Sequence, residues 1–214
     1  MNIGLSKNSK RIVIKIGTNS IMKSIDKINY HKFDRLAYVC STLRQQGHDV
    51  ILVASGAVGA GACTLNMDAY PDSIAEKQAL ASVGQGVLMN LYSRFFQHYD
   101  QHVGQILMTR DIVSYPNAYE NCQTTINSLL RNKIIPIINE NDAVSVDESG
   151  RRSKFGENDT LAAVVTEVTE ADMLIILSDI EGLYDSNPHT DSEAKLIHYV
   201  GEISDEILAM AGGA

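Results

Sequence analysis

Long apolar runs are missing from this chain of 214 residues, and their absence excludes a membrane-spanning protein. The longest apolar runs, such as residues 173–177, are far shorter than the roughly 18 residues that a membrane-spanning helix needs. The first ten residues also contain no apolar stretch of the kind found in a signal peptide. We therefore expect a soluble, cytoplasmic protein without a membrane contact.

Cysteine and metal-binding patterns are equally sparse. Cys40, Cys63 and Cys122 are widely spaced and form no CxxC pair, so neither a zinc site nor a disulfide framework is indicated. The six histidines show no spacing typical of metal ligands. We predict reduced thiols and no metal site built from the protein's own side chains.

Positive charge is also in short supply. The chain has 18 Lys and Arg residues against 26 Asp and Glu, a formal net charge of −8. Such an excess disfavours binding to nucleic acids or anionic membranes. Aromatic residues make up 6% of the chain and form no stacking platform among basic residues, which also disfavours nucleic-acid binding. What the chain does contain is an ordinary globular share of apolar residues, 44%, enough for a substantial core.

Short apolar runs alternate with amphipathic stretches along the whole chain. Such alternation predicts βαβ units, and hence a three-layer αβα sandwich around a mainly parallel sheet. Because no repeat or linker interrupts it, we predict a single domain over residues 1–214. The predicted strands are 11–17, 50–54, 103–108, 134–138, 173–177 and 196–200, and the predicted helices are 29–46, 74–98, 117–132, 160–168 and 203–211. Val83 is among the residues of helix 74–98 that we predict to face the core.

Polar or glycine-rich clusters follow four of the predicted strands directly. In parallel α/β folds, ligands bind beyond the carboxyl ends of the strands. We therefore expect a binding site formed by residues 17–19, 55–61, 139–142 and 178–179.

The cluster at residues 55–61 contains three glycines, which let backbone N–H groups approach an anion, and a helix start would add a favourable dipole. The pattern matches neither the P-loop nor the dinucleotide-binding fingerprint. A tight turn with close packing is the alternative interpretation.

Lys15 lies between Ile14 and Ile16 in a predicted strand. Burying a lysine is costly unless its ammonium reaches a site or a partner. On a central strand, this ammonium would emerge near the carboxyl end, where it could stabilise a transferring phosphoryl group. On an edge strand, it would simply extend into solvent. The residues alone leave both possibilities open.

Two acidic clusters, residues 139–142 and 156–159, favour a cationic ligand or a metal–nucleotide. Their alternatives are turn formation for the first cluster and, for the second, capping of helix 160–168 by Asn158 or Asp159. The polar stretch between them, 143–156, is predicted to form a hairpin.

Taken in order, these segments resemble the amino acid kinase family, in particular its glutamate-phosphorylating branch. The resemblance spans about residues 11–213, and the Asn-Glu-Asn-Asp-Ala-Val and Val-Ala-Ser-Gly-Ala-Val-Gly segments are its most specific parts. The matching segments are 14–19, 53–61, 78–85, 105–111, 135–144, 155–161 and 177–185.

The resemblance implies an αβα fold and a kinase that uses ATP and Mg²⁺. The implied reaction phosphorylates the side-chain carboxylate of L-glutamate to γ-glutamyl phosphate, the first step of proline biosynthesis. Proline as a feedback inhibitor and a homo-oligomer, a dimer or a tetramer, are further expectations from the family.

The resemblance also assigns roles to residues of this sequence. It implies that Lys15 is catalytic and contacts the ATP phosphates. The implied glutamate-binding residues are Ser55, Gly56, Asn139, Asp142 and Asn158; the implied nucleotide-binding residues are Lys15, Gly17, Ser178 and Asp179; Glu157 and Asp159 would organise the site.

The family pattern continues with a Gly-Thr-Gly-Gly-Met…Thr-Lys segment that closes over the nucleotide, whereas this sequence stops at Ala214, where that segment would begin. We therefore expect a kinase domain that lacks its C-terminal end and has no PUA domain. Two alternatives stay open: another small-acid kinase of the same family, acting on N-acetylglutamate, aspartate, carbamate or UMP, and a non-catalytic module that binds glutamate or proline.

Overall fold

The computed structural model describes residues 11–143 and 157–212. The chain divides into two compact units, Met1–Leu177 and Ser178–Ala214, and each is described here by itself. The single domain predicted from the sequence stays a prediction. The hairpin predicted over residues 143–156 lies outside the described residues, apart from its first residue.

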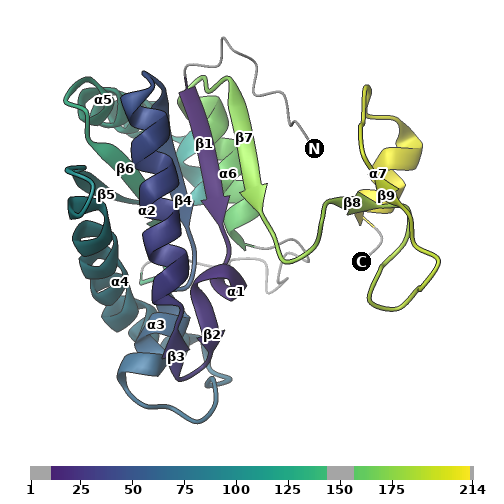
Figure 1. Ribbon diagram of the computed structural model, residues 1–214, viewed down its shortest axis with the longest axis horizontal. Helices are drawn as coiled ribbons and strands as arrows, with labels where there is room; N and C mark the ends of the chain where they lie inside the picture. The colour runs from purple at the N-terminus through teal and green to yellow at the C-terminus, as the bar shows by residue number, and fades with distance from the viewer. Residues whose placement is uncertain (1–10, 144–156, 213–214) are drawn as a thin grey trace. The chain divides into compact units, whose positions relative to one another are not determined.

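A five-stranded parallel sheet forms the centre of the first unit (Figure 1). Its order is β5-β6-β4-β1-β7, so β1 lies between two neighbours. Lys15 of β1 is paired in register with Val53 on one side and Ile176 on the other. The edge-strand interpretation of Lys15 is therefore wrong. The strands are β1 (Arg11–Ile16), β4 (Asp49–Ala54), β5 (Val103–Met108), β6 (Ile135–Glu140) and β7 (Met173–Leu177).

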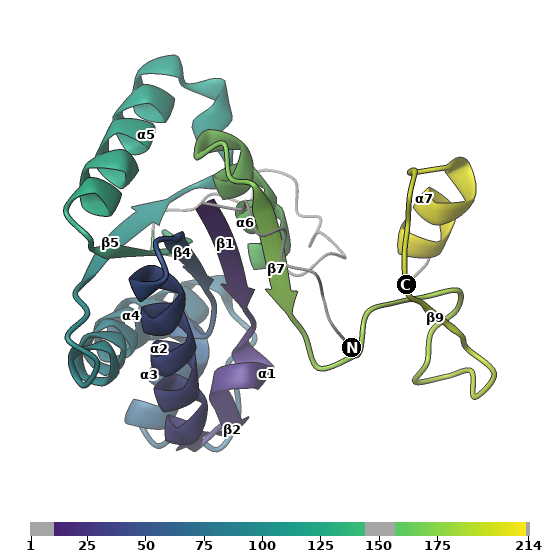
Figure 2. The same cartoon turned by 45° about the horizontal axis from the view of Figure 1, so that its top comes forward.

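Helices cover both faces of this sheet (Figures 1 and 2). Successive side chains of a strand point to opposite faces, so each strand contributes to two cores. In β1, Ile12 and Ile14 belong to the core that contains Phe33, whereas Val13 belongs to the core that contains Leu161. The predicted αβα sandwich is confirmed. The first core is covered by α2 (Tyr30–Gln45), α3 (Ala57–Thr64) and α4 (Ile74–Gln97), and the second by α5 (Pro116–Arg131) and α6 (Glu157–Val168).

Helices α3 and α4 pack together through glycines. A Cβ atom added at Gly84 would lie 1.8 Å from the Ala57 carbonyl oxygen, and one at Gly61 would lie 2.1 Å from the Leu80 carbonyl oxygen. Backbones this close leave no room for a side chain. The same contact explains why Val83, predicted to face the core, is 40% exposed: the face of α4 that approaches α3 is the Gly84 face.

Two boundaries differ from the prediction in ways that matter for the site. Strand β6 continues through Asn139 and Glu140, which pair in register with Leu107 and Met108, so these residues are extended and do not form the turn that was their alternative interpretation. Helix α6 begins at Glu157, so Asn158 and Asp159 lie within its first turn and do not cap a helix over 160–168. Sheet pairing has overridden local turn preference in the first case.

Short elements that the sequence pattern did not predict connect the main ones. They are α1 (Thr18–Ile21), β2 (Met22–Ser24), β3 (Lys27–Ile28) and the 3₁₀ helix η1 (Arg110–Ser114). Strands β2 and β3 pair antiparallel to each other. Elements this short carry too little periodicity to be recognised from sequence.

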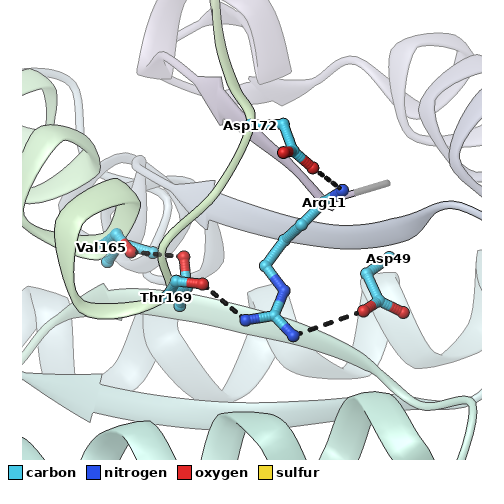
Figure 3. Close-up of polar contacts among 5 residues, drawn as sticks. All are labelled: Arg11, Asp49, Val165, Thr169 and Asp172. Atoms are coloured by element: carbon cyan, nitrogen blue, oxygen red, sulfur yellow. Dashed lines mark hydrogen bonds and ion pairs between the residues drawn. The ribbon is translucent and has the colours of Figure 1, made fainter. Parts of the chain in front are cut away.

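The amino end of the sheet is closed by polar contacts of Arg11 (Figure 3). Its guanidinium donates to the Thr169 carbonyl oxygen at 2.5 Å and forms an ion pair with Asp49 at 3.5 Å. The Arg11 backbone N–H donates to the Asp172 carboxylate at 2.8 Å. This Arg11 cluster (Arg11, Asp49, Thr169 and Asp172) joins β1, β4 and the segment between α6 and β7.

The second unit contains β8 (Leu183–Tyr184), β9 (Leu196–Ile197) and α7 (Asp205–Gly212). The two strands pair antiparallel, and the Asp185 carboxylate accepts a hydrogen bond of 2.7 Å from the Lys195 backbone N–H. The predicted strand 196–200 and helix 203–211 are both present, with shifted ends. Across both units, no helix among the described residues is long and apolar enough to cross a membrane.

Candidate functional site

A lysine–carboxylate pair lies at the carboxyl end of the sheet. Lys15 has the same parity along β1 as Val13, so its side chain lies on the face covered by α6. Its Nζ is 2.7 Å from the Oδ1 of Asp159, in the first turn of α6. The Lys15 side chain is 11% exposed, whereas that of Asp159 is 39% exposed. A largely buried ammonium is thus held by a carboxylate whose contacting oxygen is buried, while the rest of its side chain reaches solvent.

Two glycines shape the backbone around this ammonium. A Cβ atom at Gly17 would lie 3.5 Å from the Lys15 Nζ, so the backbone passes close to the charge. Gly56 has φ +97°, a conformation that other residues rarely adopt, and a Cβ there would lie 2.5 Å from Ile21 Cδ1. The left-handed turn at Gly56 directs the chain from β4 straight into α3.

The glycine-rich cluster at residues 55–61 is mostly helix, because α3 begins at Ala57. Only Ser55 and Gly56 precede α3, and the Ser55 N–H donates to the Ile16 carbonyl oxygen at 3.1 Å. This bond ties the start of α3 to the end of β1. The first N–H groups of a helix lack partners within it and carry a partial positive charge. A helix start and an ammonium at adjacent strand ends form an environment suited to anions.

Three side-chain amides form a chain of hydrogen bonds over the strand ends. Asn158 donates from Nδ2 to the Ala54 carbonyl oxygen and, at 2.9 Å, to Oδ1 of Asn139. Asn139 donates from Nδ2 to Oε1 of Gln85 at 2.7 Å. We call Asn158, Asn139 and Gln85 the amide chain. Asn139 is 2% and Asn158 is 8% exposed, so buried hydrogen bonds connect α6, β6 and α4.

A cavity of about 330 Å³ lies at the Gln85 end of the amide chain. Its volume falls within the range of small-molecule sites, about 300–1,000 Å³. Residues from α4, β5 and the end of β6 line it. The polar lining residues are Ser82, Gln85, Gln105, Glu140, Asn141 and Asp142.

The structure brings most of the predicted site residues of the first unit together. Lys15, Gly17, Ser55 and Gly56 lie at the carboxyl ends of β1 and β4, and Asp159 reaches Lys15 from the first turn of α6. Asn139 and Asn158 are bonded to each other, and Asp142 lines the cavity. Glu157 is the first residue of α6.

Ser178 and Asp179 begin the second unit. Within that unit, the Ser178 hydroxyl lies 3.4 Å from the Asp179 carboxylate and accepts a hydrogen bond of 3.5 Å from the Ile180 N–H. Their predicted contact with a nucleotide stays a prediction.

Gln85 was not assigned a role from the sequence, although segment 78–85 belongs to the resemblance. Its sequence signal is a polar amide between Gly84 and Gly86 in a helix whose neighbouring turns carry apolar residues. Such a residue is easily taken for part of a solvated helix face, and only its contact with Asn139 distinguishes it.

Among the described residues, no cluster of three or more His, Cys, Asp or Glu side chains could hold a metal ion. The three cysteines are free, and burial raises the pKa of the Cys40 thiol to about 12. Cys122 is also buried, which raises the pKa of its thiol. Both are therefore inert packing residues, and neither contributes to the site.

The fold is that of a known family. Residues 10–213 match the model of the amino acid kinase family, so the chain belongs to that family. It is 51% identical over 208 residues to the glutamate 5-kinase of Streptococcus agalactiae serotype III (strain NEM316), covering 97% of this chain and 78% of that protein. It is 54% identical over 205 residues to the glutamate 5-kinase of Streptococcus uberis (strain ATCC BAA-854 / 0140J), covering 96% of this chain and 76% of that protein. The resemblance inferred from the motifs is confirmed.

Solved structures share the fold at lower identity. An isopentenyl phosphate kinase superposes with a TM-score of 0.61 at 15% identity, covering 94% of this chain and 83% of that one. An aspartate kinase from Synechocystis gives a TM-score of 0.57 at 19% identity, covering 87% of this chain and 31% of that one. These likenesses establish the fold and leave substrate choice to the site.

Proposed function

We propose that this chain is a kinase that transfers the γ-phosphoryl group of ATP to the side-chain carboxylate of L-glutamate. Membership of the amino acid kinase family and identity of about one half to glutamate 5-kinases over nearly the whole chain support this activity. The structural observation that carries it is the Lys15 ammonium, largely buried at the carboxyl end of the sheet and paired to the exposed Asp159. The product, γ-glutamyl phosphate, would enter proline biosynthesis.

The chemistry needs positioning and charge neutralisation more than it needs proton transfer. A glutamate side chain has a pKa of about 4.3 and is already ionised at neutral pH, so no general base is required. One oxygen of the γ-carboxylate forms a bond to the γ-phosphorus of ATP. The bond from that phosphorus to the bridging oxygen breaks, and its electron pair leaves with ADP. Two anions must meet, so cationic and N–H groups must hold them together.

Lys15 is suited to this task because its partner can be exchanged. In the absence of phosphate, Asp159 holds the ammonium at 2.7 Å. A phosphate group offers stronger acceptors in the same place, and the exposed Asp159 carboxylate can return to solvent. Lys15 then stabilises the charge on the transferring group, helped by N–H groups at Gly17 and at the start of α3.

The remaining residues of the site divide between the two substrates. Ser55 and Gly56 lie where the acceptor carboxylate would approach, and Asp142 in the cavity wall is suited to the substrate ammonium. Asn139 and Asn158, which are bonded to each other, would bind glutamate and hold the strand ends and helix α6 around it. Ser178 and Asp179 would contact the nucleotide, and Glu157 and Asp159 would organise the start of α6.

Mg²⁺ fits this site as a companion of ATP. It would be held mainly by phosphate oxygens, and the exposed Asp159 carboxylate is a residue of this chain able to assist. Bound there, Mg²⁺ would neutralise part of the phosphate charge. Feedback inhibition by proline, assembly into a dimer or tetramer, and a cytoplasmic location suited to the free thiols complete the proposal.

Formation of γ-glutamyl hydroxamate tests the proposed reaction. The 214-residue chain is incubated with L-glutamate, Mg-ATP and hydroxylamine, with L-aspartate and N-acetyl-L-glutamate as competing acceptors. Product with glutamate and little with the other two is the expected result. Stronger product with another acceptor would reassign the substrate. Glutamate binding without product would favour the non-catalytic binding module.

A further inference from the structure

The amide chain has a fixed direction, because backbone groups at two points permit only one orientation of its amides. The Ala54 carbonyl oxygen can only accept, so Asn158 must present its Nδ2 there. The Glu140 backbone N–H can only donate, and it donates to Oδ1 of Asn139 at 2.9 Å. Asn158 Nδ2 donates to the same oxygen. Both orientations therefore follow from groups that cannot exchange roles.

This direction is passed on to Gln85. Because Oδ1 of Asn139 faces Asn158 and Glu140, its Nδ2 is the atom that meets Gln85. Gln85 must then present its oxygen to Asn139, which it does at 2.7 Å. A planar amide carries its nitrogen on the other side, and Gln85 lines the cavity. With its oxygen bonded to Asn139, the Nε2 of Gln85 is the amide atom left to donate to a ligand.

We infer that Gln85 is a specificity-determining residue whose Nε2 donates to the α-carboxylate of the amino-acid substrate. This inference rests on the proposed function. It adds a residue of α4 to a site otherwise built from strand ends and from the first turns of α3 and α6, and it states which group of the substrate that residue recognises.

The sheet order decides which carboxylate reaches Gln85. The strands run β5-β6-β4-β1. Lys15 lies on β1 and on the face covered by α6, whereas the cavity lies at the carboxyl ends of β5 and β6 on the face covered by α4. The γ-carboxylate must lie at Lys15, where phosphoryl transfer occurs. A glutamate that joins Lys15 to the cavity passes over the carboxyl end of β4 and therefore places its α-carboxylate and ammonium on the Gln85 side.

Charge makes a donor necessary there. Glu140 and Asp142 both line the cavity, and their side chains are unfavourable neighbours for a carboxylate. Asp142 suits the substrate ammonium, but the α-carboxylate needs an N–H donor of its own. Gln85 supplies such a donor without adding charge. The buried amides of Asn139 and Asn158 fix the orientation of the Gln85 amide, so its oxygen cannot take the place of its N–H.

Gln85→Glu tests the inference with little change in shape. The variant keeps an oxygen for Asn139 and replaces the Nε2 donor by a second acceptor. The acceptor substrates are L-glutamate and L-glutamate α-amide, which keeps the reactive γ-carboxylate but has a carboxamide in place of the α-carboxylate. We expect the wild type to prefer glutamate. In the variant, the ratio of kcat/KM for glutamate to that for the α-amide should fall by about 100-fold, mainly through KM.

Gln105→Glu is the matched control. It introduces the same charge into the same cavity wall, from β5 and outside the amide chain. It should leave the preference for glutamate over the α-amide in place, even if repulsion raises KM for glutamate. An equal loss of preference in both variants would show that charge alone is responsible, and would overturn the inference.

Gln85→Met removes the donor without adding charge. We expect it to bring the two acceptors to similar kcat/KM values, and wild-type discrimination by this variant would overturn the inference. Thermal unfolding of both Gln85 variants verifies that they fold. If Gln85→Glu does not fold, the result for Gln85→Met tests the inference. Gln85→Asn then replaces Gln85→Glu as the second variant, because its shorter side chain withdraws the amide donor from the cavity.

Measurements on the wild type distinguish failure of the proposed kinase activity from failure of the inference about Gln85. If the wild type forms no hydroxamate, that function fails, and calorimetry of L-glutamate and its α-amide then decides the inference. Tighter wild-type binding of glutamate, reversed in Gln85→Glu, would support the role of Gln85 in binding. Equal wild-type affinity for the two ligands, or no binding of either, would overturn it.

Discussion

The two ends of strand β1 carry one basic residue each, and they use it differently. At the amino end, the Arg11 guanidinium is engaged by the Thr169 carbonyl oxygen and by Asp49, both fixed protein groups. At the carboxyl end, the Lys15 ammonium is held by Asp159, whose side chain is 39% exposed. The Arg11 contacts hold the amino end of the sheet together. The Lys15 ammonium has a partner that a phosphate group can replace.

The difference follows from the direction of a parallel sheet. Every strand of the sheet points the same way, so helix starts with their unpaired N–H groups gather near the carboxyl ends. These groups favour anions there. Arg11 lies at the opposite end, close to Thr169 just after the end of α6, where carbonyl groups are available as acceptors. One strand can thus carry a structural cation and a functional one.

Replacing Lys15 by Met should have the largest effect of the four substitutions, and it should act on kcat. We expect kcat to fall by about 1,000-fold, equivalent to about 4 kcal/mol, because the transferring phosphoryl group loses its cation. Glutamate binding should be nearly intact, and the remaining Asp159 can be hydrated. The hydroxamate assay and glutamate calorimetry measure the two effects, with Lys27→Met, an exposed lysine of β3, as the control. Unchanged turnover in the Lys15 variant would remove its catalytic role.

Gly84→Ala should show that the backbones of α3 and α4 at the carboxyl end of the sheet are tightly packed, although the Lys15–Asp159 ion pair at the same end can be exchanged. The added Cβ would lie 1.8 Å from the Ala57 carbonyl oxygen, so α3 and α4 must separate. We expect a loss of about 3 kcal/mol in the free energy of unfolding, measured with urea. Gly86→Ala is the matched control, because a Cβ there meets nothing within 4 Å. It should stabilise the helix by up to about 1 kcal/mol, and equal effects of the two changes would contradict this packing.

Asn158→Ala should weaken function and stability together. It leaves the Ala54 carbonyl oxygen without its donor and removes one of the two donors to Asn139. We expect kcat/KM for glutamate to fall by about 100-fold and the free energy of unfolding to fall by about 2 kcal/mol. Asn132→Ala serves as the comparison, since its amide bonds to the Ser128 carbonyl oxygen on an exposed helix end. A loss of stability without a loss of activity would make Asn158 a purely structural residue.

Arg11→Met should give the smallest effect and the opposite pattern from Lys15→Met. The guanidinium loses a hydrogen bond and a partly exposed ion pair, so the free energy of unfolding should fall by about 1.5 kcal/mol. The Arg11 N–H still donates to Asp172, and kcat should be unchanged. Arg11→Lys, which keeps the charge, should recover part of the loss. A drop in kcat comparable to that of Lys15→Met would mean that the two ends of β1 are not functionally distinct.

Much of the fold could be predicted from local pattern. The apolar runs identified every strand of the main sheet, and their alternation with helices predicted its parallel direction. The errors lie where tertiary contacts override local preference. Asn139 and Glu140 have turn-forming character but remain extended because β5 pairs with them, and Val83 gives up its expected inward position because Gly84 makes the close contact with α3.

The sequence by itself determined that Lys15 and the polar clusters stand at strand ends, because hydrophobic periodicity locates strands and their direction places those ends on one edge. Only the tertiary structure decided that β1 is interior, that Asp159 pairs with Lys15, and that Gln85 ends a chain of amides. Asn158 meets a carbonyl oxygen 104 residues away, and Gln85 is bonded to Asn139 across 54 residues. Such partners are chosen by how layers pack in space, which periodicity along a chain does not encode.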